Sequence, residues 1–238
     1  MQGPPWRPRA VVFDVFNTIV LPRPDQAGSF QRGLRDCGVR LEPDPLPALQ
    51  SASEGLTHSA ASISRADYLD WCRATLAEVR ASGIRGGIAS RVVPALEQLW
   101  QAPMRPLPGV VELLTELHER GATIAACSNW SWDLPGDLAG CGLGDLIDVV
   151  VPSARVGHRK PHREIYARVL AKAGVAAAEA LFVGDSLSAD VEGPLRAGIP
   201  AVHLLRSDRP SPARWQIDDI ARLRDLLAPD WGGGSSGR

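Results

Sequence analysis

The chain has 238 residues, of which 45% are apolar, and its 26 basic and 27 acidic side chains leave a formal net charge of −1. Because so small a charge produces no long-range field, we expect neither nucleic acid nor an anionic membrane surface as a partner. No apolar run approaches the roughly 18 residues of a membrane span, and prolines and arginines interrupt the first nine residues where a secretory signal needs an apolar core, so we expect a cytoplasmic protein.

The first predicted element is a strand over residues 10–16, a β-branched and aromatic run too short for a helix. Nearly continuous hydrophobicity is typical of a strand buried on both faces. Asp14 is the single charged residue that interrupts it. The next stretch, residues 22–103, shows helical spacing, no convincing strand, and prolines at both ends. We expect it to form an all-helical cap inserted into the core.

The rest of the chain alternates strands with helices. Helical spacing recurs over residues 110–120 and 166–173. Such alternation predicts an α/β fold, here a Rossmann-like parallel five-stranded sheet with helices on both faces. The predicted core domain comprises residues 1–21 and 104–228, and the glycine-rich residues 229–238 form a flexible tail. The four further apolar runs that predict strands are residues 123–129, 149–153, 180–186 and 201–205.

Polar side chains gather at the carboxyl ends of these runs, where the ligand crevice of an open parallel sheet lies. Carboxylates at strand ends, together with a lysine and hydroxyl groups, predict a site for a divalent cation and an anion. The residues concerned are Asp14, Thr18, Ser128, Asn129, Lys160, Asp185 and Asp190.

Several of these residues also have purely structural explanations. Asp190 could cap the following helix, and the hydroxyls of Thr18 and Ser128 could stabilise turns. Asp14 is different, because a charge inside an apolar strand is costly to bury without a partner. Lys160 is one of only two lysines in an arginine-rich chain, and its compact ammonium suits a point charge beside an anion.

The order and spacing of these residues resemble the four motifs of the haloacid dehalogenase-like hydrolase superfamily. The resemblance spans residues 10–206, and the helical insert after the first motif is similar to the cap of one subgroup. The motifs are Asp14-x-x-x-Thr18, Ser128, Lys160 and Gly184-Asp185-Ser186-x-x-x-Asp190.

The resemblance implies a role for each residue around the substrate. Asp14 is the nucleophile and forms a covalent aspartyl intermediate. Thr18 and Ser128 donate hydroxyl hydrogen bonds, and Lys160 neutralises the charge that Asp14 and the bound group share. Asn129 adds an amide donor that binds the substrate.

The resemblance also implies a Mg²⁺ cofactor. Its expected oxygen ligands are the carboxylates of Asp14 and Asp185 and the backbone carbonyl of Phe16. Asp190 is expected behind these ligands, or to reach the metal through water.

Phe16 departs from the pattern of most phosphatases in this superfamily. They carry a second Asp at this position, two residues after the nucleophile, which protonates the leaving oxygen and later activates water. Phe16 can do neither, and loss of a general acid or base typically costs about 10²–10⁴-fold in rate. Either the leaving group needs no proton, or another group substitutes, for which His158 and His162 beside Lys160 are candidates.

Dehalogenases of the superfamily also carry an aromatic residue where this chain has Phe16, because halide leaves without a proton. Lys160 followed by Tyr166 is similar to their third motif. Against this alternative, Asp185 occupies a position where these metal-free enzymes carry Ser. The insert offers only Arg32 and Arg35 as loosely placed counterparts of the arginine that holds their substrate carboxylate.

We therefore predict a Mg²⁺-dependent phosphatase that hydrolyses a small phosphorylated metabolite through an aspartyl-phosphate at Asp14. A 2-haloacid dehalogenase-type hydrolase that forms an aspartyl ester is the first alternative. A non-catalytic phosphate-binding or interaction protein is the second. The sequence predicts no particular oligomeric state.

Overall fold

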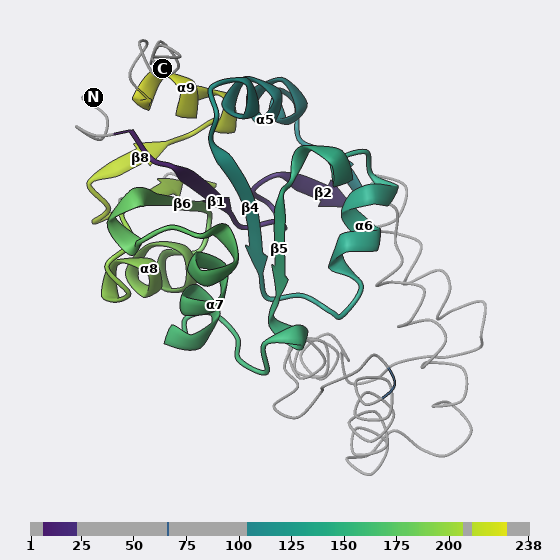
Figure 1. Ribbon diagram of the computed structural model, residues 1–238. Coiled ribbons are helices and arrows are strands. Elements are labelled where there is room, and N and C mark those ends of the chain that lie inside the picture. Colours follow the sequence, from purple (N-terminus) through teal and green to yellow (C-terminus); the bar gives the residue numbers. More distant parts are fainter. Residues whose placement is uncertain (1–6, 23–65, 67–103, 207–210, 228–238) are drawn as a thin grey trace, which may run out of the picture.

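A six-stranded parallel sheet forms the centre of the protein (Figure 1). The computed structural model describes residues 7–22, 66, 104–206 and 211–227. The strand order β5-β4-β1-β6-β7-β8 confirms the predicted α/β fold and adds one strand, β8, to the five expected. The strands are β1 (Ala10–Phe13), β4 (Thr123–Ser128), β5 (Val149–Pro152), β6 (Ala180–Gly184), β7 (Ala201–Leu204) and β8 (Trp215–Ile217).

Helices cover both faces of this sheet, as predicted. Helices α5 (Val110–Glu119), α6 (Leu134–Gly140) and α9 (Leu223–Leu226) pack on one face, and α7 (Arg163–Ala173) packs on the other beside α8 (Gly193–Arg196) (Figure 1). Val11 and Phe13 of β1 join the first core cluster, and Ala10 and Val12 join the second. All four are fully buried, because alternate side chains of a strand point to opposite faces of the sheet.

The ends of α7 follow the local sequence. The ring nitrogen Nδ1 of His162 accepts a hydrogen bond of 3.3 Å from the backbone N–H of Glu164, which caps the first turn. Gly174 ends the helix in the left-handed conformation, with φ of 65°. Among the described residues, no helix has both the length and the hydrophobicity needed to cross a bilayer.

Two short antiparallel strands form a second, separate sheet. Strand β2 (Val20–Pro22) pairs with β3 (Met104–Pro106), and Val20 lies opposite Pro106. The sequence did not predict this ribbon, because prolines cannot donate to a strand ladder and argue against a strand. Apart from Pro22 and Ala66, the predicted helical cap at residues 22–103 lies outside the described residues, as does the tail at 229–238. Both stay predictions.

The parallel arrangement brings three polar loops to one edge of the sheet. Strand β1 is hydrogen-bonded to β4 on one side and to β6 on the other. Asp14 comes directly after β1, Ser128 is the last residue of β4, and Asp185 comes directly after β6. These three residues therefore meet at the carboxyl edge, where ligands of open α/β sheets bind.

Candidate active site

Asp14 sits at the start of a tightly folded loop. Its backbone N–H donates to the carbonyl of Val183 on the neighbouring strand at 2.9 Å. The carbonyl of Val15 accepts from the N–H groups of the three residues that end the loop, at 2.9 to 3.2 Å. Asn17 turns the loop with a φ of 59°, a left-handed conformation that asparagine tolerates better than most residues. The loop thereby returns Thr18 to the carboxylate of Asp14.

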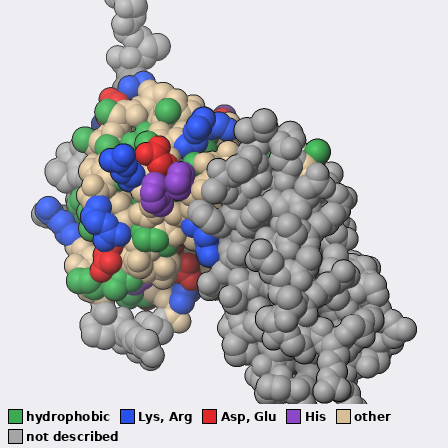
Figure 2. All heavy atoms as spheres, turned by 90° about the horizontal axis from the view of Figure 1, so that it is seen from below, with side chains coloured by type: hydrophobic (Ala, Val, Ile, Leu, Met, Phe, Trp, Pro, Cys, Tyr) green, Lys and Arg blue, Asp and Glu red, His purple; other side chains and the backbone are tan. Residues whose placement is uncertain are grey.

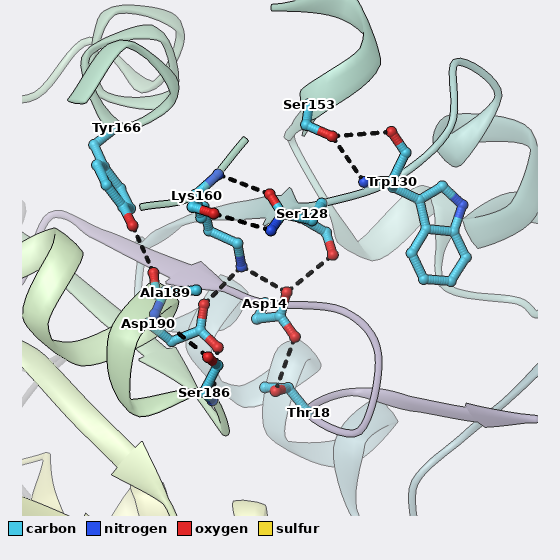
Figure 3. A network of polar contacts seen from close by, with 11 residues as sticks. Asp14, Thr18, Ser128, Trp130, Ser153, Lys160, Tyr166, Ser186, Ala189 and Asp190 are labelled. Carbon is cyan, nitrogen blue, oxygen red and sulfur yellow. Dashed lines mark hydrogen bonds and ion pairs between the residues drawn. The ribbon is translucent and has the colours of Figure 1, made fainter. Parts of the chain in front are cut away.

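Three side chains contact the carboxylate of Asp14, which is itself only 7% exposed (Figure 3). Oδ1 accepts from the Ser128 hydroxyl at 2.9 Å and lies 2.6 Å from the ammonium nitrogen of Lys160. Oδ2 accepts from the Thr18 hydroxyl at 3.3 Å. The buried charge thus has the partners that burial requires, and all three were singled out from the sequence.

Lys160 joins two acidic residues. Its ammonium nitrogen lies 2.6 Å from Asp14 Oδ1 and 2.6 Å from Asp190 Oδ1. Burial alone would lower the pKa of Lys160, but the charges of Asp14 and Asp190 more than offset this and raise it. Lys160 is therefore a permanent cation at neutral pH.

Asn129 fixes the backbone of Lys160. Its amide donates to the Lys160 carbonyl at 3.1 Å, and its oxygen accepts from the Lys160 N–H at 2.7 Å. The residue next to Ser128 thus positions the lysine. Its predicted contact with the substrate stays a prediction.

Asp190 is enclosed rather than placed as a helix cap. It is 1% exposed, and its Oδ2 accepts from the backbone N–H of Ser186 at 2.9 Å. Ser186 supplies the cap of the following π-helical turn, Leu187–Glu192, so the capping explanation of Asp190 is wrong. A Cβ on Gly184 would lie 2.4 Å from Cγ of Asp190, so the site needs glycine there.

Asp185 completes a cluster of three carboxylates. One oxygen each of Asp14, Asp185 and Asp190 lies within 4.8 Å of the others. Burial raises the pKa of Asp185 and the charge of Asp14 raises it further, whereas Arg206 and Lys160 lower it. Burial likewise raises the pKa of Asp190, against the opposing effect of Lys160. One ammonium among three carboxylates leaves an excess of negative charge on oxygen atoms, which fits a hard divalent cation.

The two histidines beside Lys160 contact each other. The rings of His158 and His162 stack on each other with centroids 4.0 Å apart, and Figure 2 shows two adjacent histidine side chains at the molecular surface. His162 also caps α7. These contacts give no support to their proposed role as a substitute acid or base at Asp14.

Tyr166, part of the dehalogenase-like third motif, contacts the turn that contains Asp190. Its side chain is buried, and its hydroxyl donates to the carbonyl of Ala189 at 2.6 Å (Figure 3). The tyrosine therefore supports the turn that carries Asp190.

Two supporting residues escaped the sequence analysis. His203 contacts the carbonyl of Asp185 through Nε2 at 3.1 Å and the hydroxyl of Ser211 through Nδ1 at 2.6 Å. Arg206 donates to the carbonyl of Asn17 through Nε at 2.7 Å and also through Nη2. The strand order explains why His203 and Arg206 lie near the site, because the end of β7 lies beside the end of β6. An exposed arginine in an arginine-rich chain gives no signal in the sequence.

Phe16 is a partly exposed residue of the loop that follows Asp14. Its side chain is 43% exposed, and its ring centroid is 6.5 Å from that of Trp130. A phenyl ring has no proton to give or take. The site therefore combines a buried carboxylate, a fixed cation and a cluster of oxygen donors, without a carboxyl group at this position.

Known proteins resemble the chain in sequence and in fold. A family model described as haloacid dehalogenase-like hydrolase matches residues 8–198. Haloacid dehalogenase-like hydrolase domain-containing protein 3 of Homo sapiens is 28% identical over 201 residues, covering 80% of this chain and 79% of the relative. Ribulose-1,5-bisphosphate 5-phosphatase of Halopiger xanaduensis is 29% identical over 241 residues, covering 92% of this chain and 99% of the relative. The magnesium-bound crystal structure of the HAD-hydrolase YfnB from Bacillus subtilis has a TM-score of 0.67 at 22% identity, covering 93% and 99%, which supports the fold.

Proposed function

Since the chain belongs to the haloacid dehalogenase-like hydrolases, we propose that it is a Mg²⁺-dependent phosphatase that hydrolyses a small phosphorylated metabolite through an aspartyl-phosphate at Asp14. The observation that carries this proposal is the carboxylate of Asp14 held 2.6 Å from the Lys160 ammonium, within a cluster of three acidic side chains. The relatives named phosphatases support the same reaction class.

Asp14, Asp185 and the Phe16 carbonyl are the proposed metal ligands, with Asp190 fixed behind them by Lys160 and Ser186. Bound Mg²⁺ supplies positive charge that brings a phosphate dianion beside a carboxylate and stabilises the charge of the transition state. The fit rests on the donor set, since carboxylate and carbonyl oxygens are the ligands that Mg²⁺ prefers.

The first step is attack by a carboxylate oxygen of Asp14 on phosphorus. A bond forms between that oxygen and phosphorus, the ester P–O bond breaks, and its electron pair leaves with the ester oxygen. Lys160 keeps its charge beside Asp14 throughout, and the hydroxyls of Ser128 and Thr18 hold the carboxylate in one orientation. In the second step a water oxygen bonds to phosphorus and the bond between phosphorus and the Asp14 oxygen breaks. Its electron pair restores the carboxylate, and the protons of the water leave with the inorganic phosphate or pass to solvent.

Phe16 limits which esters react well. Without an acid at this position the ester oxygen departs as an anion. The alcohol that is released must therefore have a low pKa, so that its anion is stable. Phenols, with a pKa of about 10, satisfy this far better than simple alcohols. We therefore expect aryl phosphates to be hydrolysed much faster than alkyl phosphates.

Carbon-centred hydrolysis is the second candidate, and Phe16 is the observation that favours it. Halide leaves without a proton, so a haloacid dehalogenase has no use for an acid there. The acidic cluster argues for the phosphatase, because three carboxylates around one ammonium need further positive charge.

A substrate panel with and without metal tests the proposal. With Mg²⁺ we expect phosphate release from phenyl phosphate, its loss on addition of EDTA, and no halide release from 2-haloacids. The matched variants are Asp14→Asn, expected to be inactive, and Asp145→Asn at an exposed position, expected to be fully active. Metal-independent halide release would establish the dehalogenase instead. Binding of phosphate without turnover of any compound would indicate a non-catalytic protein.

A further inference from the structure

We propose that Phe16 and Trp130 form an aromatic subsite that binds an aromatic ring in the leaving group of the substrate, so that the natural substrates are aryl phosphates. The inference rests on the proposed phosphatase function and extends it to a substrate class.

Exposed aromatic side chains are rare in the described part of the chain. Phe16, Val111 and Leu195 are the exposed large apolar side chains there, and Phe16 is the only aromatic one of the three. Phe16 lies two residues after the buried carboxylate of Asp14, in the loop that carries Thr18. Exposure of a single apolar ring is common on protein surfaces, so what distinguishes this ring is its place: Phe16 is 43% exposed in the loop that follows the buried carboxylate of Asp14, and it contacts a second aromatic ring.

Trp130 meets Phe16 from the neighbouring strand end. The two rings are tilted at 45°, with centroids 6.5 Å apart, within the range in which aromatic rings attract each other. Trp130 follows Ser128 by two residues, and its indole lies at the edge of the polar network around Asp14 (Figure 3). Both rings thus belong to segments that also carry contacts of the Asp14 carboxylate, from Thr18 and from Ser128, and we place the leaving group of a bound phosphate ester beside them.

Trp130 is held rigidly, as a binding surface should be. Its indole N–H donates to Asp137 at 2.8 Å, its backbone N–H donates to the Ser153 hydroxyl at 3.1 Å, and its carbonyl accepts from the Ala154 N–H at 3.2 Å. A surface fixed before binding loses little conformational entropy when a ligand arrives. The polar end of the indole is satisfied and part of its apolar surface packs against the hydrophobic core, so only the partly exposed remainder is available to a ligand.

The stability of the leaving group and the packing on Phe16 and Trp130 both favour an aromatic ring on the ester oxygen. The ring of Phe16 stands where it cannot supply a proton, so the leaving oxygen must carry a stable negative charge. Attachment to an aromatic ring provides that stability, and the same aromatic ring packs on Phe16 and Trp130. A single residue thus determines both the electronic and the steric preference of the site.

The test separates ring binding from leaving-group acidity. Wild-type protein with Mg²⁺ is assayed on phenyl phosphate and on hexafluoroisopropyl phosphate, an alkyl ester whose alcohol is about as acidic as phenol. We expect kcat/KM to favour the phenyl ester about three- to tenfold, the range of an aromatic contact. Phe16→Leu, which keeps an apolar side chain, and Trp130→Leu should remove most of that preference. Val111→Ala, at an equally exposed apolar position on α5, should retain it.

If Phe16→Leu keeps the preference for the phenyl ester, the proposed subsite is wrong, whereas the proposed phosphatase function still holds. If wild-type protein hydrolyses neither ester, the phosphatase proposal fails, and calorimetric titration with phenylphosphonate and methylphosphonate then decides the subsite. Tighter binding of the phenyl compound to wild-type protein but not to Phe16→Leu supports it. Equal binding of the two compounds, or binding of neither, overturns it.

Discussion

Arg206, just beyond β7, donates from its guanidinium to the backbone carbonyl of Asn17, with Nε 2.7 Å from that oxygen. This contact anchors the loop that follows Asp14 at its one left-handed residue. Arg206 also lowers the pKa of Asp185 against the larger effect of burial. The side chain of Arg206, 189 positions after Asn17, therefore links the loop that follows Asp14 to the acidic cluster.

Replacement of Arg206 by Ala should slow catalysis more than it destabilises the fold. Loss of hydrogen bonds at an exposed side chain costs about 1 kcal/mol of unfolding free energy, whereas a loop that shifts Asp14 lowers kcat by about tenfold. Urea denaturation and steady-state kinetics on phenyl phosphate measure the two effects. Arg196→Ala, which removes an exposed pair with Glu192 at 3.7 Å, is the matched control. Unchanged kcat in Arg206→Ala would show that the contact does not position Asp14.

Lys160→Met and Asp14→Asn should both abolish activity but affect stability in opposite ways. Without Lys160, the buried carboxylates of Asp14 and Asp190 lose their shared cation, which costs about 3–5 kcal/mol. Asp14→Asn instead removes one of two negative charges around the ammonium, so it should leave the unfolding free energy unchanged or raise it. Its loss of activity should exceed about 10⁴-fold, as expected for a nucleophile.

Urea denaturation in EDTA at pH 7.5 compares these variants. Lys172→Met, at the exposed second lysine of the chain, controls for the substitution itself and should be neutral. Equal destabilisation by Lys160→Met and Asp14→Asn would contradict the described charge balance.

Metal binding should become more favourable as the pH rises. Burial and the charge of Asp14 raise the pKa of Asp190 to about 7, from about 4 in an unfolded chain. The folded state therefore binds this proton more tightly, and the resulting stability is complete below pH 4 and is lost as the pH rises through about 7. In EDTA, wild-type protein should lose stability relative to Asp190→Asn between pH 5 and pH 8.

Thermal unfolding with and without Mg²⁺ checks this. Ionised Asp190 and Asp185 attract a cation, so Mg²⁺ should raise the melting temperature more at pH 8 than at pH 5.5. The Asp185→Asn variant should show a much smaller rise at either pH. A rise that is the same at both pH values would contradict the assignment of these carboxylates to the cluster.

The sequence indicated those site residues whose type is unexpected in their sequence context. Asp14 stands out because a charge inside an apolar run needs a compensating reason, and Lys160 because lysine is rare in this chain. The structure brings these two within 2.6 Å of each other. The link from Asn129 to the Lys160 backbone escaped prediction, because it depends on how two loops 31 residues apart approach each other.

The fold was predictable where a repeating pattern was long enough to read. The five strands found from the sequence are continuous apolar runs, and the α5 and α7 stripes have helical spacing. Strand β8 has three residues, too few to establish a period of two. Strands β2 and β3 each end in a proline. Because proline lacks the N–H that a strand ladder needs, its presence argues against predicting a strand from the sequence.

Phe16→Asp should broaden the substrate range toward alkyl phosphates. An aspartic acid at this exposed position places a proton donor two residues after Asp14, so the leaving oxygen no longer has to depart as an anion. Measured as kcat/KM, which reports the steps up to release of the alcohol, hydrolysis of an unactivated alkyl phosphate should rise by about 10²-fold, the lower range of general acid catalysis, while phenyl phosphate gains little. Activation of water in the second step would raise kcat for both esters alike. Phe16→Asn is the matched control, because it has nearly the same shape but no acidic proton. If Asn and Asp raise alkyl phosphate hydrolysis equally, the limiting feature of the wild-type site is the bulk of Phe16 and not its missing proton.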